Sequence, residues 1–166
     1  MRDKSIVLTR SQIDQKIDRI AFEIYENSFE ENVIYLGGIS GNGFLFAERL
    51  VAKLSEISDQ SVRLFELSID KDAPLEHEIN LSVSNEELQG STMILVDDVI
   101  NSGRTMSYAV RKILENKLKV LKIATLVNRT HRRFPVHADF VGLNIATTLK
   151  DNIVVQLDGE EVAYLD

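Results

Sequence analysis

The sequence predicts an α/β protein with a mainly parallel central sheet flanked by helices. Short apolar runs rich in β-branched residues alternate along the chain with longer segments whose apolar residues recur every three or four positions. Several of the apolar runs end in Gly-rich or Asp-rich loops. Alternating strands and helices require crossover connections, which leave the strands parallel, and ligands then bind beyond the carboxyl ends of those strands.

The first half of the chain predicts two helices and two strands. Residues 33–36 form a strand that ends at Gly37-Gly38, and residues 62–67 alternate as a second strand. Either Thr9 or Ser11 is the candidate N-cap of the first helix. The apolar stripe of that helix comprises Ile13, Ile17, Ile20, Ala21, Ile24 and Tyr25, and that of the second helix comprises Phe44, Leu45, Ala47, Leu50, Val51 and Leu54.

The second half begins with an acidic segment, residues 70–89, which we expect to be mobile and partly a hairpin. Strands follow at 92–96 and 120–127, with short late strands at 140–141, 153–157 and 162–165. A helix is predicted over 105–114, with Met106, Ala109, Val110, Ile113 and Leu114 on its buried side. We expect residues 1–166 to form one domain, since this length suits a single core.

Composition excludes several classes of function. The chain has 166 residues, of which 44% are hydrophobic, and it has no cysteine, so disulfides and thiolate metal sites are excluded. A net charge of −7 argues against nonspecific nucleic-acid binding. The N-terminus lacks the apolar core of a signal peptide, and no apolar run reaches the ~18 residues of a membrane helix. We therefore expect a cytoplasmic protein without a membrane partner.

The strongest chemical pattern is the loop that follows the strand at 92–96. Asp97 and Asp98 stand at the end of the strand, and small residues then lead into a helix whose N-terminus attracts anions. Ser102 and Thr105 add hydroxyl donors, while two carboxylates suit cis-diol hydroxyls or Mg²⁺. These residues predict a ribose 5-phosphate site. The alternative is an ordinary polar loop in which Ser102 or Thr105 caps the helix.

The same segment resembles a known family. The residues from Ile94 to Thr105, ILVDDVINSGRT, are similar to the signature of type I phosphoribosyltransferases, with Ser102 in place of the usual Thr. Further likeness to the bifunctional pyrimidine-operon attenuator/uracil phosphoribosyltransferases lies in Asn128-Arg129-Thr130-His131-Arg132 and in the string ADFVGLN from Ala138. The first helix, AERL from Ala47 and VVQL from Val154 also match, so the resemblance covers nearly the whole chain.

The resemblance implies a type I phosphoribosyltransferase fold with a small hood and a mobile loop. It implies transfer of phosphoribose from phosphoribosyl pyrophosphate (PRPP) to a nucleobase, with uracil favoured, Mg²⁺ as cofactor, and a homodimer or higher homo-oligomer. Asp97, Asp98 and Arg104 would be catalytic, the two aspartates also holding Mg²⁺ directly or through water. PRPP would contact Ile100, Asn101, Ser102, Gly103, Arg104, Thr105, Ser40, Gly41 and Asn42, and the base would contact Asn128, Phe140 and Val141.

Three of these assignments have structural alternatives. Phe140 is either a base-stacking residue or a core residue, and Asn128 either reads the base or occupies a turn. Arg129, Arg132 and Arg133 are either ligand contacts or solvated surface.

The sequence also departs from the family in the first loop. Where relatives carry Lys-Thr-Arg-Gly, this chain has Ser40-Gly41-Asn42-Gly43, and both basic residues are gone. The aromatic–Arg pair expected after the third strand is missing, and Lys71 is the only basic residue there. Two alternatives to a transferase follow: a noncatalytic sensor of nucleotides and an RNA-binding regulator of pyrimidine metabolism.

Overall fold

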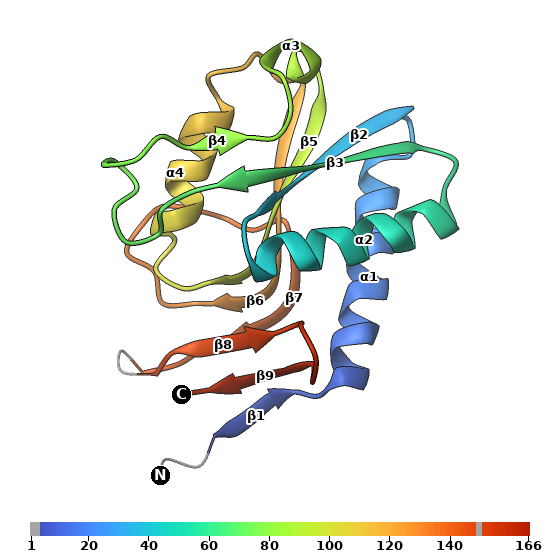
Figure 1. Cartoon of the computed structure of the whole chain (residues 1–166). Coiled ribbons are helices and arrows are strands. Elements are labelled where there is room, and N and C mark those ends of the chain that lie inside the picture. Colours follow the sequence, from blue (N-terminus) through green and yellow to red (C-terminus); the bar gives the residue numbers. More distant parts are fainter. Residues whose placement is uncertain (1–3, 149–150) are drawn as a thin grey trace.

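The computed structural model describes residues 4–148 and 151–166, which build two sheets and four helices (Figure 1). The larger sheet has six strands in the order β4-β3-β2-β5-β6-β7, and all neighbours in it are parallel except β4 and β3. The smaller sheet is antiparallel, in the order β1-β9-β8. The predicted α/β class with a mainly parallel sheet is confirmed, and the small sheet takes the place of the expected hood.

The first half of the chain follows the expected order. It contains β1 (Ser5–Leu8), α1 (Arg10–Ser28), β2 (Val33–Ile39), α2 (Asn42–Ile57) and β3 (Ser61–Ser68). Thr9 is the N-cap of α1, where its side chain accepts the backbone N–H of Gln12 and forms a capping box with it. The strand β1 was not predicted from the sequence, because four residues that are mostly exposed carry no alternating pattern.

The second half contains β4 (Asn80–Leu81), α3 (Asn85–Leu88), β5 (Thr92–Ile100), α4 (Arg104–Ile113), β6 (Val120–Arg129), β7 (Phe140–Ile145), β8 (Ile153–Gln156) and β9 (Val162–Leu165). Within residues 70–89 the structure has β4 and α3, and β4 pairs antiparallel with β3, which lies before this segment, so the hairpin spans the segment instead of lying within it. Both β5 and β6 run past their predicted ends, so Asp97, Asp98 and Asn128 lie within strands rather than after them.

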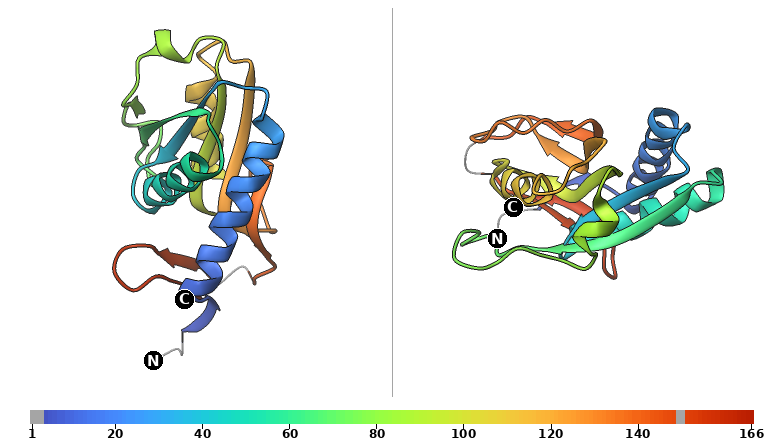
Figure 2. Two further views of the ribbon diagram at one scale, coloured as in Figure 1. Left: turned by 90° about the vertical axis from the view of Figure 1, so that its right-hand side faces the viewer. Right: turned by 90° about the horizontal axis from the view of Figure 1, so that it is seen from above.

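Two apolar layers cover the faces of the larger sheet. Helices α1 and α2 pack on one face around Phe46 and Leu50, and α4 packs on the other around Met106 and Ile113 (Figure 2). The stripe of α1 is confirmed, since all of its predicted members but Tyr25 are buried. Leu114 is 59% exposed because α4 ends one residue before it, which corrects its predicted burial.

Candidate functional site

The site lies where the strand order of the larger sheet reverses. The chain proceeds from β2 outward to β3 in one direction, and from β5 through β6 to β7 in the other. Such a reversal leaves a crevice at the carboxyl ends of the two central strands, which is where α/β proteins bind ligands. The loop that begins at Ser40 leaves β2 and the loop that begins at Asn101 leaves β5, so both loops singled out in the sequence meet at this point.

A tight turn connects β5 to α4. Gly103, directly before the helix, has a φ of +85°, a left-handed conformation that favours glycine, and a Cβ there would lie 3.1 Å from the backbone oxygen of Phe134. The backbone oxygen of Ser102 accepts the N–H groups of Arg133 and Phe134 at 3.1 and 3.0 Å. The segment after β6 therefore fixes the turn through these two hydrogen bonds. The turn leads into the N-terminus of α4, where partial positive charge favours an anion.

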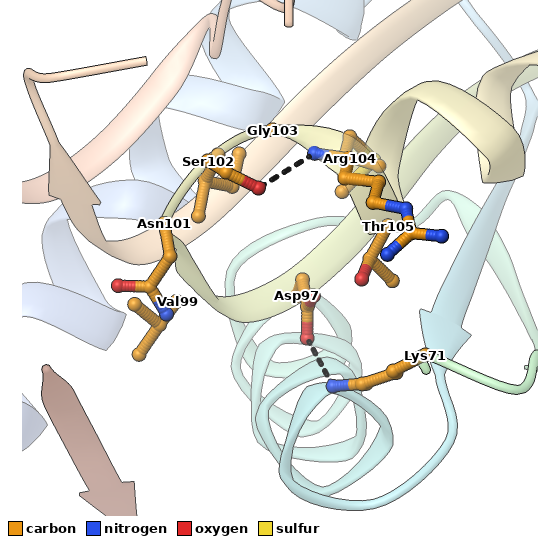
Figure 3. A pocket seen from close by; sticks show the side chains of 10 residues that line it. Lys71, Asp97, Val99, Asn101, Ser102, Gly103, Arg104 and Thr105 are labelled. Carbon is orange, nitrogen blue, oxygen red and sulfur yellow. Dashed lines mark hydrogen bonds and ion pairs between the residues drawn. The ribbon is translucent and has the colours of Figure 1, made fainter. Parts of the chain in front are cut away.

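A cavity of about 110 Å³ lies under this turn (Figure 3). The sequence-predicted residues Asp97, Ile100, Asn101, Ser102, Gly103, Arg104 and Thr105 line it, together with Lys71, Val99 and Met106. The structure thus brings the whole predicted phosphate loop and one of the two aspartates to one cavity. Lys71 reaches it from the segment after β3, with its Nζ 4.0 Å from Oδ1 of Asp97.

Asp97 is a buried carboxylate, with only 3% of its surface exposed. Burial raises the pKa of the Asp97 carboxyl well above its ordinary value, and the nearby Asp98 raises it further. Lys71 and the N–H of Asp98, which Oδ1 accepts at 2.9 Å, offset part of that rise. A hydroxyl donor or a cation that entered the cavity would therefore stabilise a charge that the protein itself leaves partly unpaired.

Asp98 lies outside this cavity. Its carboxyl group nevertheless lies close to that of Asp97, and beyond the effect of burial Asp98 raises the pKa of Asp97 through its charge and through a side-chain hydrogen bond. The backbone oxygen of Asp98 accepts the hydroxyl of the fully buried Thr125 at 3.2 Å, which fixes this part of β5 to β6. Of the expected pair of carboxylates, Asp97 thus lines the cavity and Asp98 adjoins it.

The loop after β2 is engaged in internal contacts. The N–H of Ser40 donates to Leu67 at 2.9 Å, and the side-chain amide of Asn42 donates to the backbone oxygen of Val155, on β8, at 2.8 Å. Ser40, Gly41 and Asn42 line neither this cavity nor the one described below. Their contact with PRPP stays a prediction.

The three predicted base-binding residues also make internal contacts. Asn128 donates to Oδ1 of Asn144 at 2.8 Å, and its own Oδ1 accepts from Arg132, whose guanidinium pKa is lowered by burial. Phe140 is 4% exposed and belongs to the core beneath α1, as the alternative interpretation expected. The backbone oxygen of Val141 accepts from Arg19 at 3.1 Å. None of the three lines either cavity.

A second cavity, of about 400 Å³, adjoins the first. Asn101 and Ser102 line both cavities, and Arg129, His131, Arg133 and Asn152 complete the second. Arg129, His131 and Arg133 stand close together in the sequence. This basic run was therefore visible in the sequence as a candidate ligand contact. Lys71 had no such signal, because it is a single lysine in an acidic segment whose position depends on the folding of the β3–β4 connection.

The donor set fits a magnesium ion that arrives with a phosphate substrate. Within residues 4–148 and 151–166, no three His, Cys, Asp or Glu side chains cluster as they would around a resident metal ion. Mg²⁺ is commonly held by one or two carboxylates and by the phosphates of the substrate, which Asp97 beside the phosphate turn matches.

Along the described part of the chain, no helix has the length and apolarity needed to cross a membrane.

Comparison with known proteins places this geometry in a family. Residues 5–160 match the phosphoribosyl transferase domain, so the chain belongs to the phosphoribosyltransferase family. Curated relatives named "Bifunctional protein PyrR" are similar over almost their whole length. The protein from Macrococcus caseolyticus is 33% identical over 162 residues, covering 94% of this chain and 93% of the relative, and that from Geobacter sulfurreducens is 34% identical over 165 residues, covering 95% and 93%.

Solved structures confirm the fold. A hypoxanthine-guanine phosphoribosyltransferase from Bacillus anthracis matches with a TM-score of 0.78 and 22% identity, covering 98% of each chain. The hypoxanthine phosphoribosyltransferase of Trypanosoma cruzi, solved with its product IMP, matches with a TM-score of 0.79 and 17% identity, covering 98% of this chain and 90% of that one. The resemblance stated from the sequence, to the bifunctional attenuator group of phosphoribosyltransferases, is confirmed by the relatives above.

Proposed function

We propose that this protein transfers phosphoribose from PRPP to a nucleobase, with uracil as the favoured acceptor. The observation that carries the proposal is the cavity in which the buried carboxylate of Asp97 lies below an anion-binding turn. The 5-phosphate of a ribose is an anion and its ring carries hydroxyl donors, so the two parts of the cavity complement the two parts of this group. The match to the phosphoribosyl transferase domain supports the same activity.

The residues of the cavity have separate tasks in this reaction. The N–H groups at the start of α4 and the hydroxyls of Ser102 and Thr105 bind the 5-phosphate, while Asp97 accepts a ribose hydroxyl. As the bond from the anomeric carbon to pyrophosphate breaks, a ring nitrogen of the base forms the new bond and loses its proton. The carboxylate of Asp97 stabilises the positive charge that develops on the ribose, and the cations Lys71 and Arg104 stabilise the leaving group. Mg²⁺ bound to the pyrophosphate would neutralise part of its charge.

A product assay tests this proposal. Purified protein with PRPP, Mg²⁺ and uracil is expected to release UMP, and Asp97→Asn is expected to lower the rate at least tenfold. Asp98→Asn, outside the cavity, is expected to have a smaller effect. Lys117→Met is the control, since Lys117 is exposed and lies beside the start of β5, away from the cavity. Absence of product with uracil, hypoxanthine and guanine alike would contradict a transferase.

A noncatalytic nucleotide sensor is the second candidate, and the loop after β2 favours it. That loop contains no Lys or Arg, and the backbone N–H of Ser40 and the side-chain amide of Asn42 already donate within the protein. A pyrophosphate leaving group requires positive charge or free donors nearby. A sensor would bind UMP in calorimetric titration and release no product from PRPP and base, whereas a transferase would do both.

We also propose a homodimer or higher homo-oligomer, as the family resemblance implies, and a cytoplasmic location, as the composition indicates. RNA binding is a further regulatory alternative, supported by the word "bifunctional" in the name of the relatives and by the three arginines between residues 129 and 133. An RNA mobility-shift assay at several salt concentrations tests it, because phosphate contacts weaken steeply as salt rises. Size-exclusion chromatography with light scattering tests the dimer.

A further inference from the structure

The connection between β3 and β4 brings the cation Lys71 to the cavity. The other lining cation, Arg104, belongs to α4, whereas Lys71 lies outside any helix or strand. Its side chain is 48% exposed, and its Nζ lies 4.0 Å from Oδ1 of Asp97. A lysine ammonium is carried on a flexible four-carbon stem, so its position depends on how firmly the backbone beneath it is held.

The carboxylate of Asp70 holds this part of the backbone. Its Oδ1 accepts the N–H groups of Asp72 and Ala73 at 3.0 and 3.1 Å, which closes a turn around Lys71. Its other oxygen, Oδ2, lies 3.4 Å from Nε2 of His77, further along the connection. An aspartate forms such a turn because its carboxylate takes the place of a backbone acceptor. Lys71 therefore lies inside a turn that the side chain of its neighbour closes.

Apolar contacts anchor the connection on both sides of this turn. Ile69, before the turn, packs against the core beneath α4, and Ile79, after it, is buried in the same core. Pro74 is also buried, whereas Lys71 and Asp72 are exposed. The apolar anchors fix the course of the connection but do not extend to the residue that carries the ammonium. The contacts of Asp70 are therefore the ones that orient Lys71.

We propose that Asp70 is a positioning residue for the transfer reaction, which acts by holding Lys71 toward the leaving group of PRPP. The inference rests on the role of Lys71 in the proposed function and adds a residue that does not line the cavity. A lysine that is already held loses less conformational freedom when the pyrophosphate binds, so more of the interaction appears as affinity for PRPP. UMP has no pyrophosphate, and its affinity is therefore independent of Asp70.

Charge and positioning predict opposite effects for this residue. PRPP is an anion, so removal of a nearby carboxylate would by itself strengthen its binding. If Asp70 acts through Lys71, removal of its acceptor oxygens weakens binding instead. Asp70→Asn separates the two effects, because asparagine keeps one acceptor oxygen and favours the same turn but carries no charge.

Calorimetric titration with PRPP in the presence of Mg²⁺, and with UMP, tests the proposal. We expect Asp70→Ala to weaken PRPP binding about tenfold, as Lys71→Met is expected to do, and UMP binding less than about threefold. Asp70→Asn is expected to stay within about threefold of wild type for both ligands. Asp72→Ala is the matched control and is expected to do the same, because it removes an equal charge while the turn uses only the backbone N–H of this residue.

A double variant shows whether Asp70 acts through Lys71. Asp70→Ala combined with Lys71→Met is expected to bind PRPP within about threefold of Lys71→Met alone, because two changes to one interaction are not additive. Losses that multiplied to about a hundredfold would contradict the proposal. Amide hydrogen exchange of Asp72 and Ala73 in the ligand-free protein is expected to become faster in Asp70→Ala and to stay unchanged in Asp70→Asn.

Three results would overturn the proposal. The first is PRPP affinity in Asp70→Ala that equals or exceeds that of wild type, and the second is an equal loss for PRPP and UMP in that variant. The third is unchanged PRPP affinity in Lys71→Met, since Asp70 would then have no cation to position. Asp70→Leu keeps the shape of aspartate without its acceptor oxygens, so it replaces Asp70→Ala, with the same expected results, if that variant does not fold.

Failure of this inference is distinguishable from failure of the proposed function. If the wild-type protein produced UMP from PRPP and uracil while Asp70→Ala bound PRPP normally, the transferase would stand and the positioning role would fall. If Asp70→Ala lost affinity for PRPP alone and the wild-type protein released no product, the positioning role would stand in a protein that binds PRPP without transferring its phosphoribose.

Discussion

Gly43, at the start of α2, faces the carboxylate of Asp97 on β5 so closely that a Cβ on Gly43 would lie 2.6 Å from Oδ1 of Asp97. Side-chain atoms do not approach each other to this distance without one of them moving. Gly43 is the one residue of Ser40–Gly43 that agrees with the family pattern Lys-Thr-Arg-Gly, and its lack of a side chain makes room for the carboxylate in the cavity. The α2 helix and the phosphate turn meet at Asp97.

Gly43→Ala is expected to displace the Asp97 carboxylate and to weaken UMP binding at least tenfold. The substitution favours helix formation by up to about 1 kcal/mol, so loss of binding would not follow from a weaker helix. Calorimetric titration and thermal unfolding measure the two effects separately.

Gly90→Ala is the matched control, because Gly90 has a φ of +70° with open space around it and lies before β5. It is expected to cost about 1 kcal/mol of stability and to leave UMP affinity as it is. Wild-type affinity in Gly43→Ala would contradict the role of this contact.

Asp97→Asn is expected to stabilise the protein at neutral pH while it abolishes binding. The pKa of Asp97 is raised in the folded state, so the folded protein holds this proton more tightly than the unfolded chain does. Above the folded-state pKa the ionised carboxylate costs stability, and as pH falls through that pKa the cost disappears. The amide keeps an acceptor for the N–H of Asp98 and carries no charge. We expect a gain on the order of 1 kcal/mol at pH 7.5 that shrinks toward acidic pH.

Urea unfolding of wild type and Asp97→Asn at several pH values checks this result. A variant that was less stable than wild type at every pH would show that the charge of Asp97 stabilises the fold.

The phosphate turn and the helices could be predicted from the sequence because their information is local. The run from Met93 to Thr105 contains its own strand, turn residues and helix start, and the stripe of α1 repeats at helical spacing. That Asp97 lines the cavity and Asp98 does not was not predictable in this way. β5 continues because Val99 and Ile100 pair with Val127 and Asn128 of β6, and pairing with a distant strand leaves no mark in the local apolar pattern.

The predicted base-binding residues show the same limit. An aromatic residue at the start of a strand suits a core or a ligand equally well, and the packing of α1 over β7 decides that Phe140 is core. Lys71 enters the cavity only because Asp70 folds the next residues into a turn, in which its Oδ1 accepts the N–H groups of Asp72 and Ala73 at 3.0 and 3.1 Å. Such long-range placement depends on tertiary structure.

Arg19→Met is expected to destabilise the protein without a matching loss of nucleotide binding. The guanidinium of Arg19 donates to the backbone oxygens of Val141 and Gly142 at 3.1 and 2.7 Å, which ties α1 to β7. Its removal leaves two acceptors without this donor and is expected to cost about 1–3 kcal/mol. Urea unfolding measures the cost, and titration with UMP measures binding under conditions where the variant is folded.

The same variant tests where the base binds. If the backbone of Val141 bound the base, as the family resemblance implied, freeing it from Arg19 would raise the affinity for UMP more than that for ribose 5-phosphate. Equal affinities in variant and wild type would favour a base site elsewhere.

Lys71→Met is expected to weaken PRPP binding more than UMP binding. In Figure 3, Lys71 lies on the opposite side of Asp97 from the phosphate turn, with its Nζ 4.0 Å from the carboxylate. We expect a ribose whose 5-phosphate is in the turn and whose hydroxyls reach Asp97 to direct its anomeric carbon toward Lys71. The pyrophosphate on that carbon therefore meets the lysine, whereas UMP has no phosphate there. Loss of one charge-assisted contact predicts about a tenfold loss for PRPP with Mg²⁺ and less than about threefold for UMP.

Titration of Lys71→Met with both ligands, beside the Lys117→Met control, measures this difference. Equal losses for PRPP and UMP would mean that Lys71 acts only through Asp97, whose pKa it lowers. Unchanged affinity of Lys71→Met for both ligands would mean that Lys71 does not contact the pyrophosphate, so the segment after β3 would supply no cation to it. Because the loop after β2 holds neither Lys nor Arg, that result would count strongly for a nucleotide sensor over a transferase.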